Sequence, residues 1–368
     1  MKIALISFHF AEYAYHLACA LADENNDILL ILNKCNALME LPDLGRTKND
    51  KNPCIIMLPH LKLRNPVMII NTFKIINAIY CFTPQVIHFQ ETGKDYLICA
   101  IPFLLKYPLV LTIHDHILHT GARENKRTRC YKKILRKIPD AVITHGDRIA
   151  RETECLLPWL KGKVNSVEHG TLGKPEPTFD DKWEKGTLLF FGRIEEYKGL
   201  PYFIEAVKKL GNQDIRVKAI IAGRGNALNR YRYLIISDEN FEVLEGYIPS
   251  DRIPDLFKRA NVIVLPYTDA TQSGIAAFAL RYGRPVIATD TGSLPEIVRN
   301  GYNGLIVPPK NSLELYKAME KLIKDQNLSK IMAKNSFLLS KTDYSWKSIA
   351  KKTLNIYRQV ISDKSMNK

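Results

Sequence analysis

Short apolar runs alternate with helix-forming segments along the chain, and this alternation limits the folds available to it more than any other feature. In the first half, the expected strands are residues 2–7, 27–32, 54–59, 85–89, 108–114, 141–144 and 164–168. A second series of expected strands follows at residues 187–191, 217–222, 241–244, 262–266, 286–289 and 305–307. Strands that alternate with helices favour parallel pairing, so the sequence predicts an α/β fold.

The two series of strands are separated by a break rich in proline and glycine, Gly173-Lys174-Pro175-Glu176-Pro177. A chain of 368 residues is longer than one hydrophobic core usually serves, so two domains are expected. We predict a first Rossmann-like domain at 1–172, a linker at 173–186, a second Rossmann-like domain at 187–341 and a C-terminal helix at 342–368 that crosses back to the first domain. Doubly wound domains bind ligands at the carboxyl ends of their strands.

Composition limits the class of protein and its compartment. Hydrophobic residues make up 46% of the chain and charged residues 25%, which is typical of a globular protein. The seven cysteines include no Cys-x-x-Cys pair, so we expect buried free thiols in a reducing cytoplasm rather than disulfides or zinc ligands. The apolar N-terminus is too short for a signal peptide, and the longest apolar stretch, 96–105, is much shorter than the roughly 20 residues that cross a bilayer.

The formal net charge of +15 calls for an acidic partner: nucleic acid, an anionic membrane or a phosphorylated substrate. The third class is favoured by the segment from Gly192 to Leu200, in which a strand ends at a glycine and Arg193 and Lys198 flank the loop before a helix. Backbone amides at the start of a helix and two cations together suit a diphosphate. The alternative for this segment alone is surface charge.

Further glycines follow later strands of the second series. Gly223 and Gly225 come directly after one strand, where glycine lets the main chain approach a ligand closely. Gln272, Ser273 and Gly274 precede a helix whose first amides are expected to bind the distal phosphate.

In their order along the chain, these loops resemble the second domain of the family 4 (group 1) glycosyltransferases. The matching segments are Gly192-Arg193-x4-Lys198-Gly199-Leu200, Ala222-Gly223-x-Gly225, Gly246-Tyr247-Ile248-Pro249, Leu265-Pro266, Gly283-Arg284-Pro285-Val286-Ile287-Ala288, Gly292-Ser293-Leu294-Pro295-Glu296-Ile297-Val298 and Gly301-x-Asn303-Gly304-Leu305-Ile306-Val307. The likeness is thinner in the first domain, where it consists of Val86-Ile87-His88, Thr112-x-His114-Asp115 and Asp140-Ala141-Val142-Ile143. It implies the GT-B architecture, in which two Rossmann-like doubly wound domains, acceptor-side and donor-binding, face each other across a cleft.

One family feature is missing from this chain. The family usually carries two glutamates in an E-x7-E pattern, and counting back from Gly283 places Ala270 and Phe278 at these positions. Asp269 is expected to supply the first carboxylate, and none replaces the second, which in the family grips the ribose of the donor. The base of the donor nucleotide stays open, and so does a non-catalytic interpretation.

The resemblance also implies roles for individual residues. Arg193 and Lys198 would neutralise the departing diphosphate, His114 would face the donor sugar, and Asp269 would bind its hydroxyls. The remaining donor-binding candidates are Gly192, Gly223, Gly225, Tyr247, Ile248, Gln272, Ser273, Gly274 and Glu296. The cases for His88, His145 and His169 are weaker. No metal motif appears in the sequence, and enzymes of this family work without a bound divalent ion, so no cofactor is expected.

A cationic segment in the first domain is a separate candidate for binding. Eight basic residues and one acidic residue lie within 123–137, and the apolar residues Tyr131, Ile134, Leu135 and Ile138 recur at helical spacing. One interpretation is a helix that packs its apolar face on its own domain. The other is a helix, Arg123–Lys137, on the anionic inner face of a membrane. Nucleic acid is not expected, because no known binding motif accompanies the charge.

These expectations together describe a cytoplasmic, peripherally membrane-bound, metal-independent retaining glycosyltransferase. It would move a sugar from a nucleotide-diphosphate sugar to a glycan or lipid-linked acceptor, in the synthesis of cell-surface polysaccharide or glycolipid. Two alternatives stay open: a GT-B phosphorylase or epimerase, and a degenerate GT-B binding subunit without activity.

Overall fold

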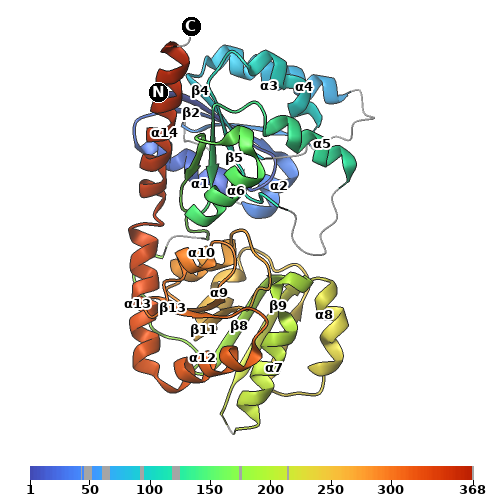
Figure 1. The fold of residues 1–368 in the computed structure, drawn as a ribbon, viewed down its shortest axis with the longest axis vertical. Helices are drawn as coiled ribbons and strands as arrows, with labels where there is room; N and C mark the ends of the chain where they lie inside the picture. Colours follow the sequence, from blue (N-terminus) through green and yellow to red (C-terminus); the bar gives the residue numbers. More distant parts are fainter. Residues whose placement is uncertain are drawn as a thin grey trace. The chain divides into compact units, whose positions relative to one another are not determined.

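The computed structural model describes residues 1–42, 44, 52–59, 67–91, 95–117, 125–173, 176–213 and 215–366. They form two compact units, drawn in Figure 1. The first unit contains the described residues of Met1–His116, Arg123–Gly170 and Trp346–Lys368, and the second contains those of Ile117–Ala122 and Thr171–Ser345. The described part of 173–186, where a linker is expected, therefore belongs to the second unit.

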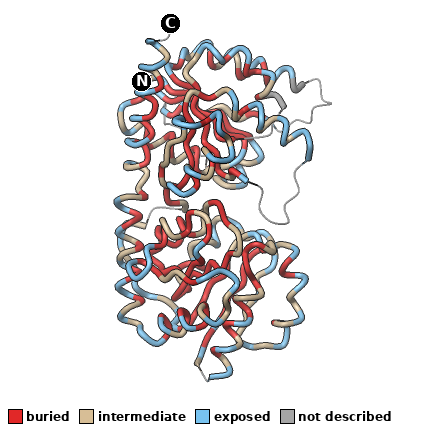
Figure 2. The backbone as a smooth tube through the Cα atoms, viewed as in Figure 1, coloured by how far each residue is buried: buried red, intermediate tan, exposed pale blue. Residues whose placement is uncertain are grey.

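A parallel sheet with the strand order β3-β2-β1-β4-β5-β6-β7 forms the centre of the first unit. Its strands are β1 (Lys2–Ser7), β2 (Asp27–Asn33), β3 (Cys54–Leu58), β4 (Val86–Gln90), β5 (Leu109–Thr112), β6 (Ala141–Thr144) and β7 (Val164–Ser166). The order reverses between β1 and β4, which is the switch point of a doubly wound sheet. The central strands are buried along their length, as apolar strands covered by helices on both faces must be (Figure 2).

The helices of the first unit include one from the far end of the chain. They are α1 (Ala11–Asp23), α2 (Lys34–Glu40), α3 (Val67–Phe82), α4 (Asp95–Leu104), α5 (Lys126–Leu135), α6 (Asp147–Leu156), the 3-10 helix η1 (Pro158–Leu160) and α14 (Trp346–Met366). The hydroxyl of Tyr357 on α14 lies 2.6 Å from His88 Nδ1 on β4, and Lys364 Nζ lies 2.9 Å from the Asp140 carboxylate. These contacts fix α14 to the first unit.

The second unit has a parallel sheet of its own, with the strand order β10-β9-β8-β11-β12-β13. Its strands are β8 (Thr187–Arg193), β9 (Lys218–Arg224), β10 (Phe241–Glu245), β11 (Val262–Leu265), β12 (Val286–Thr289) and β13 (Gly304–Val307). Its helices are η2 (Glu196–Lys198), α7 (Leu200–Gly211), α8 (Asn226–Tyr231), η3 (Arg232–Leu234), α9 (Ile253–Arg259), α10 (Gly274–Arg281), α11 (Leu294–Ile297), α12 (Ser312–Lys324) and α13 (Gln326–Lys341). In this sheet too the order reverses, between β8 and β11.

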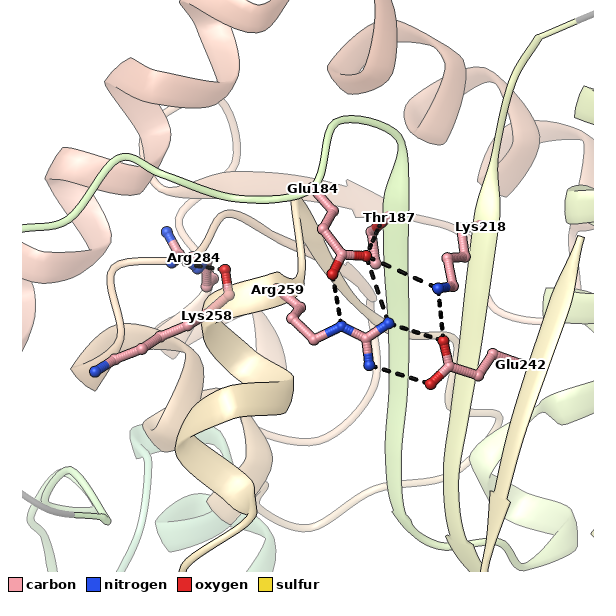
Figure 3. Close-up of polar contacts among 7 residues, drawn as sticks. All are labelled: Glu184, Thr187, Lys218, Glu242, Lys258, Arg259 and Arg284. Carbon is pink, nitrogen blue, oxygen red and sulfur yellow. Dashed lines mark hydrogen bonds and ion pairs between the residues drawn. The ribbon is translucent and has the colours of Figure 1, made fainter.

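An ion-pair network joins the amino ends of three strands of the second unit (Figure 3). Arg259, the last residue of α9, donates to the carboxylates of Glu184 at 2.7 Å and Glu242 at 2.8 Å. Lys218, at the start of β9, pairs with Glu242 at 2.8 Å. Since all strands of this sheet are parallel, the network lies at the edge opposite to their carboxyl ends and stabilises the sheet away from the predicted donor loops.

Arg284 belongs to a family-like segment but has a packing role here. Its side chain is fully buried, and its guanidinium donates to the carbonyl oxygens of Phe257, Asp180, Lys182 and Lys258 at 2.8–3.1 Å, the last of which Figure 3 shows. A buried charge needs such hydrogen bonds to offset the loss of water. Arg284 thereby joins the chain before β8 to α9. No helix among the described residues is long and apolar enough to cross a bilayer.

Candidate functional site

The residues predicted to bind the donor gather at one edge of the second sheet. They lie in the last residues of β8 and β9 or in the segments that follow β8, β9, β10, β11 and β12, namely Gly192, Arg193, Lys198, Gly223, Gly225, Tyr247, Ile248, Asp269, Gln272, Ser273, Gly274 and Glu296. Parallel strands all end at the same edge, so residues from distant parts of the sequence become neighbours there.

The two predicted cations hold different positions at this edge. Arg193 is the exposed last residue of β8, whereas Lys198 ends the short helix η2 and is only 8% exposed. The ammonium of Lys198 lies 3.7 Å from the centre of the Tyr267 ring. Gly199 follows with a φ of 73°, and a Cβ there would lie 1.8 Å from the carbonyl oxygen of Pro266, so this close approach requires glycine.

Tyr267 connects these cations to the next loop, and it is not among the residues predicted from the sequence. The residue is 1% exposed, and its hydroxyl lies 3.3 Å from Ser273 Oγ. Burial raises the pKa of the Tyr267 phenol, while the bond to Ser273 and the charge of Arg193 lower it in part, so the phenol stays neutral at pH 7. The sequence signal that could have identified Tyr267 is its position directly after Leu265-Pro266, at the carboxyl end of an expected strand.

Ser273 and Gln272 shape the start of α10. The Ser273 hydroxyl accepts a hydrogen bond from the Ala276 amide at 3.4 Å, as an N-cap residue does. Gln272 Oε1 is buried and has no hydrogen-bond partner among the described residues. A ligand that donates a hydroxyl or amide hydrogen would satisfy this oxygen.

The carboxyl ends of β8 and β9 and the start of the loop after β10 pack closely through their main chains. A Cβ on Gly223 would lie 1.8 Å from the Gly192 carbonyl oxygen, and the Gly223 φ of 143° also favours glycine. The Gly246 amide donates to the Gly223 carbonyl oxygen at 3.0 Å. Next to it, Tyr247 is 52% exposed and Ile248 packs on the hydrophobic core.

The two positions of the missing family glutamates differ in the structure. Asp269 lies half-buried in the loop after β11, beside the buried Ala270. Phe278 lies on α10, with its ring 5.6 Å from that of Phe257, so the second position serves packing here. The loop of Asp269 is bound to the loop before α11, because the Ser293 amide donates to the Thr271 carbonyl oxygen at 2.9 Å. Glu296 lies half-buried on α11.

His114 lies in the first unit, two residues beyond the end of β5. It was expected to end the strand 108–114, but the strand stops at Thr112. His114 Nε2 lies 2.8 Å from Gln90 Oε1 at the end of β4, and the Phe10 ring stacks on the imidazole at 3.8 Å. The structure brings His145 and His169 beside it, because they follow β6 and β7, the next strands of the sheet.

These three imidazoles are neutral at pH 7. Burial lowers the pKa of His114 well below the ordinary value and lowers those of His145 to about 4 and His169 to about 3. They are 3–7% exposed. Each therefore offers a proton-free ring nitrogen.

The cationic helix α5 holds the loop of His114 in place. Arg136, just past its end, pairs with Glu91 at 2.6 Å and donates to the carbonyl oxygens of Asp115 at 2.9 Å and His116 at 3.1 Å. Lys132 lies 4.0 Å from Glu91. Arg136 and Lys132 therefore pair with Glu91, although the sequence places them among the cations of a helix that could bind a membrane. Arg123 lies outside the described residues.

Comparisons with known proteins identify the same family in both halves of the chain. The sequence model described as "Glycosyltransferase Family 4" matches residues 11–170, and the one described as "Glycosyl transferases group 1" matches residues 178–338. An uncharacterized glycosyltransferase of Methanocaldococcus jannaschii is 25% identical over 84% of this chain and 86% of its own length. The alpha-D-kanosaminyltransferase of Streptomyces kanamyceticus is 27% identical over 48% of this chain. The chain matches less than half the length of the first curated relatives, 44% and 46%.

Solved structures share the fold over the whole chain. Sucrose-phosphate synthase from Thermosynechococcus elongatus superposes with a TM-score of 0.71 at 19% identity, covering 99% of this chain and 100% of its own. Anabaena HepE in complex with UDP has a TM-score of 0.72 at 17% identity, covering 98% of this chain and 100% of its own. The fold is therefore GT-B, as predicted.

Proposed function

Because the chain belongs to the group 1, family 4 glycosyltransferases, we propose that it moves a sugar from a nucleotide-diphosphate sugar to a glycan or lipid-linked acceptor, with retention of the anomeric configuration. The observation that carries this proposal is the grouping of Arg193, Lys198 and Ser273 around Tyr267 at the carboxyl edge of the second sheet. The complexes of Anabaena HepE with UDP and with UDP-glucose support a nucleotide-sugar donor.

The two cations act on the diphosphate as it leaves. Negative charge grows on the leaving phosphate while the bond to the sugar breaks, and fixed positive charges nearby stabilise that state. Lys198 is prepared for this role, since its ammonium is held over the Tyr267 ring before the substrate arrives. The amides at the start of α10 bind the distal phosphate.

Cations of the protein replace a divalent metal at the phosphates in this proposal. His114 acts at the donor sugar, and Asp269 binds its hydroxyls. The leaving phosphate accepts the proton of the acceptor hydroxyl, as retention in the resembled family implies.

We also propose that α5 brings the enzyme to an anionic membrane, where lipid-linked acceptors and cell-surface polysaccharide precursors lie. Lys126, Arg129, Lys133 and Lys137 are exposed on this helix and its end, so they remain available to lipid headgroups. Each basic residue near an anionic leaflet contributes roughly 1 kcal/mol.

The missing family glutamates favour a second candidate, a GT-B subunit that binds a nucleotide without turnover. One experiment separates the two. Thermal-shift screening against nucleotides and nucleotide sugars identifies the donor. A ligand at 100 times its dissociation constant raises the free energy of unfolding by about 2.7 kcal/mol. Product analysis with that donor and a set of acceptors then follows. Transfer supports the transferase, whereas binding without any product supports the non-catalytic subunit.

A further inference from the structure

Three buried histidines meet at the carboxyl edge of the first sheet, and one of them, His114, is the residue that we assign to the donor sugar. His114, His145 and His169 follow the neighbouring strands β5, β6 and β7, and their ligand nitrogens all lie within 4.8 Å of one another. We propose that these histidines bind a divalent transition-metal ion of the zinc class. No metal was expected from the sequence, since these residues form no motif with the spacing of metal ligands.

Hydrogen bonds fix which nitrogen of each ring is free to bind a metal. His145 Nδ1 lies 3.0 Å from the Val167 carbonyl oxygen, and His169 Nδ1 lies 2.8 Å from that of Gly170. His114 Nε2 lies 2.8 Å from Gln90 Oε1. An oxygen of this kind only accepts, so each of these nitrogens carries the ring proton and donates it.

The opposite nitrogens therefore carry the lone pairs. Two of them, His114 Nδ1 and His145 Nε2, are buried and have no hydrogen-bond partner among the described residues. The third is His169 Nε2. A ring that donates one nitrogen to an oxygen and offers the other is the usual arrangement of histidine around a metal, because the bond orients the ring.

The distances allow a metal after a small movement of the rings. Zinc–nitrogen bonds are about 2.0–2.1 Å long, so two nitrogens in tetrahedral coordination lie about 3.4 Å apart. Rotation of the side chains must bring the rings together by roughly an ångström or more. Tyr13 packs against all three rings at 5.0–5.3 Å, which keeps the group together.

The ligand set determines which ions fit. Neutral imidazoles suit zinc, copper, nickel and cobalt, whereas magnesium prefers oxygen ligands. Three histidines leave a fourth position for water or an anion. This site is therefore chemically distinct from a magnesium site at a nucleotide diphosphate.

Cobalt titration of the tag-free full-length protein tests the proposal. We expect one equivalent of Co²⁺ to produce the visible absorption of tetrahedral cobalt, Zn²⁺ to displace it and Mg²⁺ to have no effect. His145→Gln and His169→Gln keep an amide hydrogen for the carbonyl bonds but lose the imidazole, so each should bind at least about tenfold more weakly.

His116→Gln is the matched control, since His116 is also buried but pairs with Glu152 outside the cluster. Circular dichroism of each variant is measured alongside, and only variants with the wild-type spectrum are compared. Absence of stoichiometric binding in the folded wild type would overturn the proposal. Equal affinity in His145→Gln, His169→Gln and wild type would also overturn it, because the ion would then bind elsewhere.

Discussion

At the edge where we propose that the donor binds, the surroundings of two cations differ at the scale of single residues. Lys198 is nearly enclosed, and its ammonium lies over the face of Tyr267, which offers it partial negative charge. Arg193 is exposed, and its positive charge partly lowers the pKa of the same Tyr267 phenol. We therefore expect a buried cation, Lys198, and an exposed cation, Arg193, to stabilise the negative charge of the same leaving diphosphate.

The first prediction concerns these cations. Arg193→Ala and Lys198→Ala should each lower kcat by about 10²–10³, with a smaller effect on donor affinity, because the charge they stabilise grows in the transition state. Steady-state kinetics and donor titration measure the two effects separately. Lys317→Ala, which removes an exposed lysine paired with Glu314, should behave as wild type. Normal turnover in Arg193→Ala or Lys198→Ala would show that the substituted residue does not stabilise the leaving diphosphate.

The second prediction compares the positions of the missing glutamates. Asp269→Asn should lower transfer by about tenfold or more, since it weakens a hydrogen bond to a sugar hydroxyl at the reacting centre. Phe278→Leu should change transfer little and lower thermal stability by roughly 1 kcal/mol, because Phe278 packs on Phe257. Steady-state kinetics measures the transfer rate of both variants, and thermal melting measures their stability. An active Asp269→Asn enzyme would show that this carboxylate does not replace the family glutamate.

At the scale of elements, the sequence was sufficient to locate the strands, although not every strand end, since β5 stops at Thr112. It was not sufficient to predict the order of the strands in each sheet. The apolar runs at 141–144 and 286–289 match β6 and β12. The order of the sheets depends on contacts between distant segments, so the grouping of His114 with His145 and His169 was out of reach. Tyr267 was missed for a similar reason: only the packing of η2 against the segment after β11 shows that Lys198 lies on its ring.

The third prediction concerns the network that joins β9, β10 and α9. Hydrogen bonds from Arg259 lower the pKa of Glu242 from 4.5 to about 2, against the opposing effect of burial, so its ion pairs stabilise the fold above about pH 4.5. This contribution is lost as the pH falls from about 4.5 to about 2. Glu242→Gln should lower the free energy of unfolding at pH 7 by up to about 1 kcal/mol, because the pairs are partly exposed.

Urea unfolding at pH 7 and at pH 3 measures the difference in the free energy of unfolding between wild type and Glu242→Gln. This difference should be smaller at pH 3. Glu205→Gln, at an exposed position of α7, is the control and should not change stability at either pH. A difference that grows on acidification would contradict the assignment of the stabilising charge to Glu242.

The fourth prediction concerns α5, whose cations have two different tasks. Arg136 and Lys132 contact Glu91, so replacing them would disturb the loop of His114. Arg129→Glu/Lys133→Glu/Lys137→Glu changes only exposed cations and should abolish sedimentation with anionic vesicles, while transfer to a soluble acceptor persists. Wild-type binding should fall as salt rises, and neutral vesicles should bind weakly.

The control for α5 reverses the same number of exposed cations elsewhere. The variant Lys317→Glu/Lys321→Glu/Lys330→Glu, on α12 and α13, should still bind anionic vesicles. Unchanged sedimentation of the α5 variant would show that the helix only packs on its own domain. Loss of soluble-acceptor transfer together with vesicle binding would place these cations at the acceptor instead.

At the scale of the whole molecule, we assign residues of both units to the proposed reaction. We expect transfer to need no divalent ion at the phosphates, and we expect a zinc-class ion at the histidines to inhibit transfer. In our proposal the second unit supplies Arg193 and Lys198, which take the place of a divalent cation at the phosphates. The first unit supplies His114, whose Nδ1 is one of the nitrogens in the proposed transition-metal site. A metal bound there would take the lone pair of a residue that we assign to the donor sugar.

The fifth prediction follows from this opposition. EDTA should leave transfer intact and added Mg²⁺ or Mn²⁺ should not raise it, whereas Zn²⁺ should inhibit at one equivalent and EDTA should reverse the inhibition. Transfer assays of wild type and His169→Gln measure these effects, and the variant should resist zinc because it lacks one of three ligands. A loss with EDTA that Mg²⁺ restores would overturn the role of fixed cations at the diphosphate. Stoichiometric zinc binding without inhibition would instead show that transfer does not use the Nδ1 lone pair of His114, and it would leave the assignment of Arg193 and Lys198 unchanged.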